Sequence, residues 1–210
     1  MDMININIEG NVRDNNIIFS NDQNKKKELF DEICSSLLRI QGRKHTLRSE
    51  NEKNDALTDS LRDKGYYVTD QTRFGRSGSN KSKDYDSGEL DIMICDSENQ
   101  AEIISIIEAF ELSSVGLKNT IIKSHIDKLL YKYDTAGNYE NFVVIYSKAK
   151  RFDRLWHKYK AYINELVFPD ESDIEELELS KSEIKCGFTE YYRSGKKLKL
   201  FHLFVNMHRG

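Results

Sequence analysis

The sequence contains one proline, only three cysteines and no excess of positive charge over its 210 residues. Cys34, Cys95 and Cys186 lie far apart without a CxxC pair, so neither a zinc knuckle nor a disulfide framework is expected. The formal net charge of −3 excludes a globally basic protein. A nucleic acid would therefore have to be bound by a local basic patch.

Long hydrophobic runs are also missing. No apolar run approaches the roughly 18 residues that a membrane span requires, and the amino-terminal residues lack the apolar region of a signal peptide. Unpaired and widely spaced cysteines are typical of a reducing compartment. We therefore expect a cytoplasmic protein without a membrane partner.

Several catalytic motifs are absent as well. The sequence has no GxSxG elbow, no HExxH helix and no Rossmann glycine pattern, which argues against triad hydrolases, zincins and dinucleotide enzymes. The segment GRSGSNKS is not a Walker motif, because GK[ST] does not follow at the required spacing.

The composition is that of a folded chain, with 38% hydrophobic and 32% charged residues. In the first third, alternation predicts a hairpin over residues 2–19, and apolar spacing predicts helices over 24–41 and 49–64. Ser49 begins the second helix and Gly65 ends it. We expect residues 1–45 to be an amino-terminal extension made of a hairpin and a helix, and residues 46–210 to be the main domain.

The main domain is predicted to be α/β, with one central mixed sheet flanked by helices. Its expected elements are strands at 66–75, 89–95, 102–111 and 141–147, helices at 119–134 and 152–166, and a carboxy-terminal hairpin at 183–207. A polar loop (residues 76–88) follows the first of these strands. An acidic linker (residues 169–178) opens at Pro169.

Two carboxylates stand out within the expected strands. Side chains two residues apart share a face of a strand, and a hairpin between the strands can bring Asp91 and Glu108 together. Two opposed carboxylates repel unless one takes a proton or a cation lies between them. Mg²⁺ suits such a site because it prefers hard oxygen ligands. The alternative is that both acids are solvated edge charges, which discourage aggregation.

The order of these elements resembles the PD-(D/E)xK nuclease superfamily, which has the restriction-endonuclease-like fold. The resemblance covers about residues 49–165 and rests on GELDIMI with Asp91, on IISIIEAFEL with Glu108, and on the helices and strand around them. The chain is also similar to uncharacterised bacterial proteins associated with defence against phage. The resemblance implies a DNA endonuclease dependent on Mg²⁺ or Mn²⁺, with a partner protein of a defence system that supplies target recognition. A homodimer through exposed strand edges is a further expectation.

The resemblance assigns Asp91 and Glu108 to the metal. The acid on the preceding helix corresponds to Glu52, or less favourably to Glu50. The sequence departs from the superfamily at Phe110, which stands where a lysine normally orients water. Lys128 or His125, which share a face of the next helix, could replace that lysine, with Lys123 less favoured.

Other residues have a functional and a structural interpretation of similar weight. Gln71 could touch the site or cap a loop. Arg73, Arg76, Lys81 and Lys83 could contact phosphates or simply be solvated. Trp156 and His202 are expected in the core. The second hypothesis for the whole chain is a catalytically inactive module that binds protein or nucleic acid.

Overall fold

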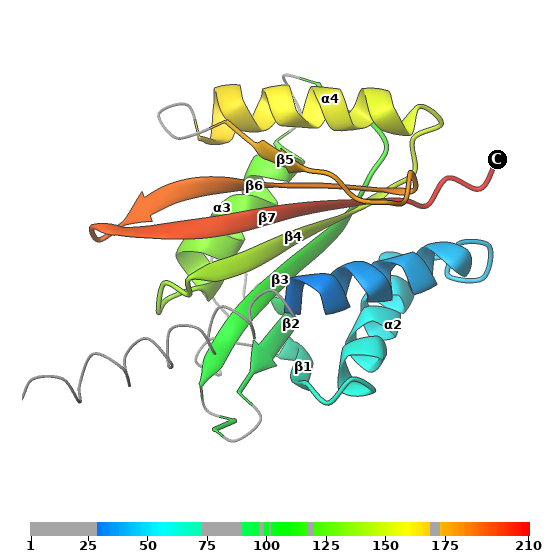
Figure 1. Cartoon of the computed structure of the whole chain (residues 1–210). Coiled ribbons are helices and arrows are strands. Elements are labelled where there is room, and N and C mark those ends of the chain that lie inside the picture. The colour runs from blue at the N-terminus through cyan, green and yellow to red at the C-terminus, as the bar shows by residue number, and fades with distance from the viewer. Residues whose placement is uncertain (1–28, 73–89, 97–98, 101, 117–119, 169–172) are drawn as a thin grey trace, which may run out of the picture.

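The computed structural model describes residues 29–72, 90–96, 99–100, 102–116, 120–168 and 173–210. The predicted hairpin at 2–19 and the four basic loop residues Arg73, Arg76, Lys81 and Lys83 lie outside this part of the chain. The described residues form one open sheet with helices on both faces (Figure 1). None of their helices has the length and apolar character needed to cross a bilayer.

The sheet has seven strands in the order β1-β2-β3-β4-β7-β6-β5. The strands β3–β4 and β4–β7 pair in parallel, and all other neighbours are antiparallel, so the prediction of an α/β protein with a mixed central sheet is confirmed. The strands are β1 (Tyr67–Thr72), β2 (Leu90–Cys95), β3 (Ile103–Leu112), β4 (Glu140–Ser147), β5 (Glu175–Leu177), β6 (Ile184–Arg193) and β7 (Lys196–Asn206).

The helix α2 (Glu50–Arg62) begins and ends as its sequence predicts. The Ser49 hydroxyl accepts from the backbone N–H of Glu52, and the Glu52 carboxylate accepts from that of Ser49, which is a capping box. Gly65 follows with a φ of 89°, a conformation that glycine adopts without a steric penalty. A further helix at residues 29–42 lies beside α2 (Figure 1).

The other two helices each change from α-helical to π-helical winding along their length. The helix α3 (Ile121–Asp127) continues as the π-helix η1 (Lys128–Tyr133), and α4 (Phe152–Tyr162) continues as the π-helix η2 (Ile163–Val167). Segments of π-helix occur frequently at functional sites. The switch in the first of these helices falls at Lys128, one of the candidate residues.

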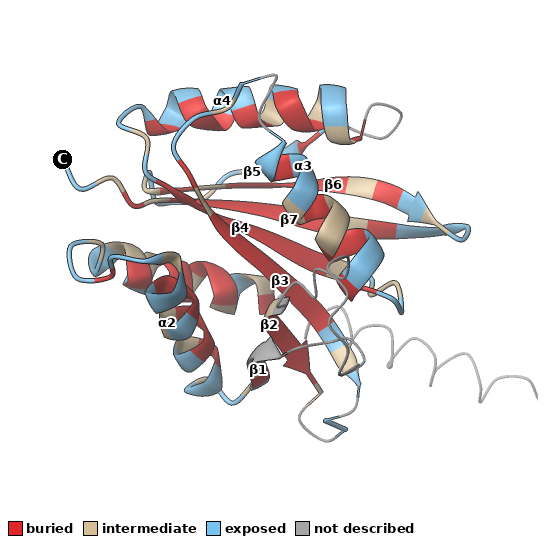
Figure 2. Ribbon diagram, turned by 180° about the vertical axis from the view of Figure 1, so that it is seen from behind, coloured by how far each residue is buried: buried red, intermediate tan, exposed pale blue. Residues whose placement is uncertain are grey.

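Two apolar cores lie on opposite faces of the sheet. One packs α3, η1 and α4 against it, with Phe110, Ile126 and Trp156 among its members. The other packs α2 and the helix at 29–42, with Leu37 and Leu57 among its members. Figure 2 shows the buried residues along the central strands and on the sheet-facing sides of the helices. The helix at 29–42 thus shares its core with elements of the main domain.

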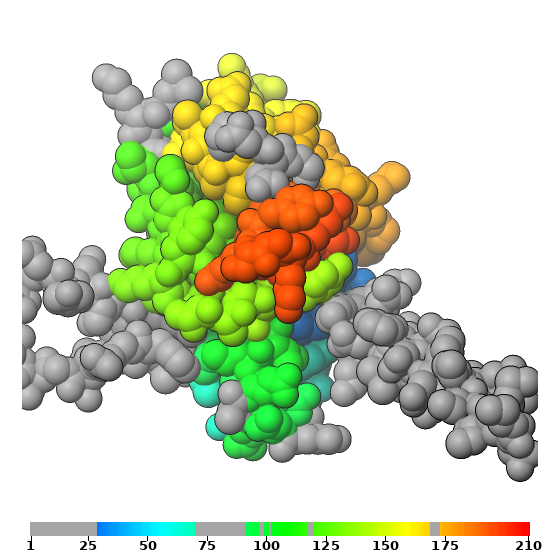
Figure 3. Space-filling view, turned by 90° about the vertical axis from the view of Figure 1, so that its left-hand side faces the viewer, coloured from blue at the N-terminus to red at the C-terminus, as the bar shows by residue number. Residues whose placement is uncertain are grey.

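The carboxy-terminal hairpin extends this sheet. The turn at Ser194 and Gly195 has positive φ at both residues, 50° and 77°, as tight hairpin turns between twisted strands require. The turn protrudes below α4 at one end of the molecule (Figure 3). Because β7 pairs with β4, the two strands of the hairpin join the sheet, and β5 follows at its edge.

The prediction of an acidic linker at 169–178 is wrong for three of its residues, because Glu175–Leu177 pair with β6. Gly187 makes this close approach feasible: a Cβ there would lie 2.6 Å from the carbonyl oxygen of Glu175. β5 is short and mostly exposed, which is a common way to end a sheet.

The core histidine predicted at His202 is confirmed. Its Nδ1 lies 2.8 Å from the Tyr159 hydroxyl and its Nε2 lies 3.0 Å from the Thr189 hydroxyl, and all three side chains are buried. Both ring nitrogens therefore have partners inside the protein. Burial lowers the pKa of His202 from 6.5 to about 3.

This buried histidine should make the protein less stable in mild acid. Because the unfolded chain binds a proton near pH 6.5 and the folded chain does not, the free energy of unfolding falls as the pH drops from 6.5 toward 3. The limiting slope from this residue is about 1.4 kcal/mol per pH unit. Urea unfolding at pH 7.5 and pH 5 should show a smaller loss for His202→Gln than for the wild type. Equal losses would contradict the assignment.

Candidate functional site

The structure brings Asp91 and Glu108 together on neighbouring strands. In the antiparallel β2–β3 pair, Met93 faces Ile106 and Ile92 faces Ile107, so that Asp91 lies opposite Glu108 one position further along. Directly opposed side chains on one face of a sheet are separated by only about 5 Å between their Cβ atoms. The carboxylates form a pair on the face that α3 covers, where Met93 and Ile106 belong to the same core.

The pair lies where β2 stops pairing with β3. Beyond Ile107, β3 has no partner residues in β2, so its N–H groups on that edge need other acceptors. Carboxylate oxygens are these acceptors. The Oδ2 of Asp91 accepts from the N–H of Ala109 at 2.8 Å, and the Oε2 of Glu50 accepts from that of Glu111 at 2.8 Å. Two acids thus replace strand pairing along this edge of β3.

Glu108 is almost fully buried, with 3% of its surface exposed. Its Oε1 lies 2.6 Å from the Nδ1 of His125, and because an ionised carboxylate can only accept, Nδ1–H is the donor. Its Oε2 is buried and has no hydrogen-bond partner among the described residues. A buried carboxylate oxygen without a donor is costly unless another group binds it.

Phe110 supports the histidine. Its ring stacks on the imidazole of His125, with the ring centres 4.4 Å apart and the planes 15° apart. Phe110 therefore holds the basic side chain that contacts Glu108. The Nε2 of His125 has no partner in the described chain, and a quarter of the side chain is exposed.

Burial and the proximity of these acids shift the pKa of Asp91. Burial, then the charge of Glu108 and more weakly that of Glu50, raise the pKa of Asp91 to about 8, against the opposing effects of the Ala109 N–H and the Lys128 charge. The raised pKa favours the protonated form of Asp91. A divalent cation between the carboxylates would favour the ionised form of both.

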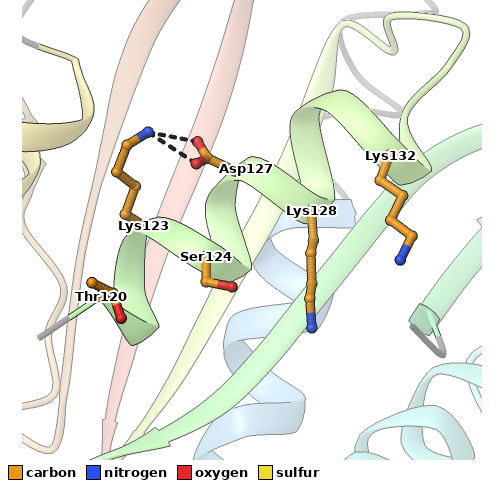
Figure 4. A pocket seen from close by; sticks show the side chains of 6 residues that line it. All are labelled: Thr120, Lys123, Ser124, Asp127, Lys128 and Lys132. Carbon is orange, nitrogen blue, oxygen red and sulfur yellow. Dashed lines mark hydrogen bonds and ion pairs between the residues drawn. The ribbon is translucent and has the colours of Figure 1, made fainter. Parts of the chain in front are cut away.

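Lys128 lies near the carboxylates without contacting them. No ion pair within 4.0 Å joins it to Asp91 or Glu108, although all three side chains are described. It lines a pocket of about 440 Å³ on α3 and η1 (Figure 4), together with Thr120, Lys123, Ser124, Asp127 and Lys132. Lys123 turns to Asp127, at 2.9 Å, whereas Lys128 extends on the other side of the helix.

The structure places Glu50, and not Glu52, beside the carboxylate pair. The carboxylate of Glu52 is occupied at the start of α2, where it accepts from the backbone of Arg48 and Ser49. The spacing Ser49-x-x-Glu52 is a capping-box signature, which could have assigned Glu52 to the cap from the sequence. Gln71 belongs to β1, and its side chain is outside the described part.

Sequence reasoning missed a second polar group on the other side of the sheet. Lys53 is 1% exposed, and its ammonium donates to Glu111 Oε1 at 2.6 Å and to the carbonyl of Ser49 at 2.8 Å. Lys148 binds the other oxygen of Glu111. The Tyr146 hydroxyl is buried nearby and has no hydrogen-bond partner in the described part of the chain. Burial, then the charges of Asp91, Glu50 and Glu111, raise its pKa. The only signal was the shared helix face of Glu50 and Lys53.

The described residues contain no group of three or more His, Cys, Asp or Glu side chains that could hold a metal ion. The arrangement thus offers two carboxylates of the protein and no closed cage. Comparison of the chain with protein-family models, with curated proteins and with solved structures found no match.

Proposed function

We propose that this protein is a metal-dependent DNA endonuclease with a restriction-endonuclease-like core of the PD-(D/E)xK type. The element order α2-β1-β2-β3-α3-β4-α4 supports the fold assignment. In it, β2 pairs antiparallel with both β1 and β3, and β3 pairs in parallel with β4. The observation that carries the function is the pair of Asp91 and Glu108 at the end of the β2–β3 ladder. One buried oxygen of Glu108 has no donor there among the described residues.

Mg²⁺ or Mn²⁺ fits this donor set. Two carboxylates supply hard oxygen ligands, and Mg²⁺ typically takes few protein carboxylates and completes its shell with waters and substrate phosphate oxygens. Asp91 and Glu108 would hold the ion, and Glu50 is the outer acid. When bound, the ion would polarise the scissile phosphate and lower the pKa of a water molecule.

The residues of α3 and η1 provide the remaining groups. Glu108 fixes His125 with the proton on Nδ1, which leaves Nε2 able to accept a proton from the attacking water. The stacked ring of Phe110 keeps the imidazole in place. Lys128 lies close enough to lower the pKa of Asp91 and can stabilise negative charge on the phosphate. The pocket that it lines would take the phosphate backbone beside the cleaved bond.

The biological role extends this proposal. We infer an effector of bacterial defence against phage, with a partner protein that recognises the target. Neither Asp91 nor Glu108 reads a base, so sequence or structure specificity would have to come from elsewhere. The sheet edges at β1 and β5 are where a second copy of the chain could pair.

Replacing either carboxylate should abolish cleavage. Asp91→Asn and Glu108→Gln each remove a charged metal ligand but keep an oxygen that can accept a hydrogen bond. We expect the rate of plasmid cleavage with Mg²⁺ or Mn²⁺ to fall at least about 100-fold in each variant, since the loss of even an outer partner of a metal ligand costs 10- to 100-fold. Asp153→Asn, at an exposed position of α4, is the matched control and should cleave like the wild type.

The same assay distinguishes a nuclease from a catalytically inactive binding module. If the wild type cleaves neither DNA nor RNA, and calorimetry detects no binding of Mg²⁺ or Mn²⁺, the protein is a binding module with an inactive nuclease fold. If it cleaves RNA alone, the chemistry stands and the substrate changes.

Lys128 and Lys123 should differ although they lie on one helix. Lys123 is paired with Asp127, whereas only Lys128 acts on the charge of Asp91. We expect Lys128→Gln to lower kcat by about 10-fold or more, because it removes a cation near the phosphate. Lys123→Gln should change kcat less than twofold. Equal effects of the two substitutions on single-turnover rates would rule out a specific role for Lys128.

A further inference from the structure

A basic pocket lies at the opposite face of the same sheet end, and the proposed chemistry does not use it. It has a volume of about 300 Å³, at the small end of the range for ligand pockets. Its walls come from three places in the sequence: Arg48 and Lys53 at the start of α2, Lys148 after β4, and residues 207–210 after β7, which include His208 and Arg209. We refer to it as the basic pocket.

The cations of the basic pocket outnumber the carboxylates that contact them. Lys53 and Lys148 share the carboxylate of Glu111. Burial opposes ionisation of Glu111, but the hydrogen bonds from Lys148 and Lys53 outweigh it and lower its pKa. Arg209 donates only to the backbone carbonyls of Lys44 and Leu47. These contacts hold the Arg209 side chain in place, and no described carboxylate lies within ion-pair distance of its guanidinium.

Lys53 is the unusual member of the basic pocket. Lysine is rarely buried, and this one is 1% exposed. Its ammonium has three donors, and two of them are used, by Glu111 and by the carbonyl of Ser49. The third has no acceptor among the described residues. A buried ammonium with a donor to spare, in a pocket with two arginines and a second lysine, is suited to bind an anion with several oxygen atoms.

The basic pocket is close to the carboxylate pair. Glu50 connects the two, because its charge acts on Asp91 and its carboxylate accepts from the N–H of Glu111. Glu108 faces α3 and Glu111 faces α2, three residues apart on β3, which corresponds to about 10 Å along a strand. Nucleotides of one strand of a duplex rise by about 3.4 Å each. A nucleic-acid strand with one phosphate at the carboxylate pair would thus place another phosphate, a few nucleotides away, at the basic pocket on the other face of the sheet end.

We propose that the basic pocket binds a phosphate group of the nucleic-acid substrate a few nucleotides from the scissile bond. This inference rests on the proposed nuclease function. Arg48, Lys53, Lys148 and Arg209 supply the donors, and Glu111 positions the two lysines. The pocket fixes the strand and does not take part in bond cleavage, so its effect is on substrate affinity.

The first test uses inorganic phosphate and the full chain without divalent metal. Phosphate should raise the melting temperature at constant ionic strength, because a ligand of the folded state stabilises it. Arg48→Gln and Lys148→Gln should each weaken phosphate binding about 10-fold, as expected for the loss of a charge-assisted hydrogen bond. Lys158→Gln, an exposed lysine of α4, is the matched control and should bind phosphate like the wild type.

The second test uses a single-stranded oligonucleotide in EDTA, with binding followed by fluorescence anisotropy over a range of salt concentrations. The double variant Arg48→Gln with Lys148→Gln should lower the slope of log affinity against log salt by about 0.7, the value for one phosphate contact on a single strand. Its affinity should fall in parallel. The control variant should keep the slope of the wild type.

The outcomes separate this proposal from the nuclease proposal. Phosphate binding that is unchanged in Arg48→Gln and Lys148→Gln would overturn it, as would a loss of phosphate binding with unchanged oligonucleotide affinity. If both bindings need the basic pocket but no metal-dependent cleavage exists, the pocket is a nucleic-acid site on a chain that is not a nuclease.

Discussion

The candidate site depends on the place where β2 stops pairing with β3. The N–H groups of Ala109 and Glu111 would otherwise be buried donors without acceptors, which folded proteins avoid. Asp91 and Glu50 provide the acceptors, so these two acids are part of the sheet's own hydrogen bonding. With Asp91 held there, the register of the hairpin leaves Glu108 directly opposite it. The concentration of negative charge is thus a consequence of how this edge of β3 is completed.

The two faces of the sheet neutralise that charge differently. On the α2 side, Lys53 and Lys148 share the carboxylate of Glu111, so that each of its oxygens is paired with a cation. On the α3 side, His125 satisfies one oxygen of Glu108, and the other is buried without a donor among the residues that the structure describes. This unequal neutralisation is the physical reason why the proposed chemistry is placed on the α3 side. The α2 side has cations to spare, which suits the binding of a phosphate.

Short sequence patterns predict most helices and strands, whereas contacts between residues far apart in the sequence are not visible in such patterns. The capping box at Ser49, the alternation of β3 and the Ser194-Gly195 turn each lie within a few residues, so the sequence reveals them. Asp91 and Glu108 were foreseen as partners because a hairpin joins their strands. The contact of Lys53 with Glu111 spans 58 residues, and the pairing of β4 with β7 is set by the packing of the whole sheet. The exposed, acidic β5 has no apolar alternation that could have revealed it.

Phe110 shows how an apolar residue on a strand can support a basic side chain of the helix that covers it. The position is 1% exposed and lies in the core beneath α3, where a lysine ammonium would need a carboxylate close by. Glu108 already has a partner in His125, and the Phe110 ring packs against that partner. The helix changes to π winding at Lys128, whose charge lowers the pKa of Asp91. In this arrangement the basic groups come from α3 and η1, and Phe110 on the strand stacks on one of them, His125.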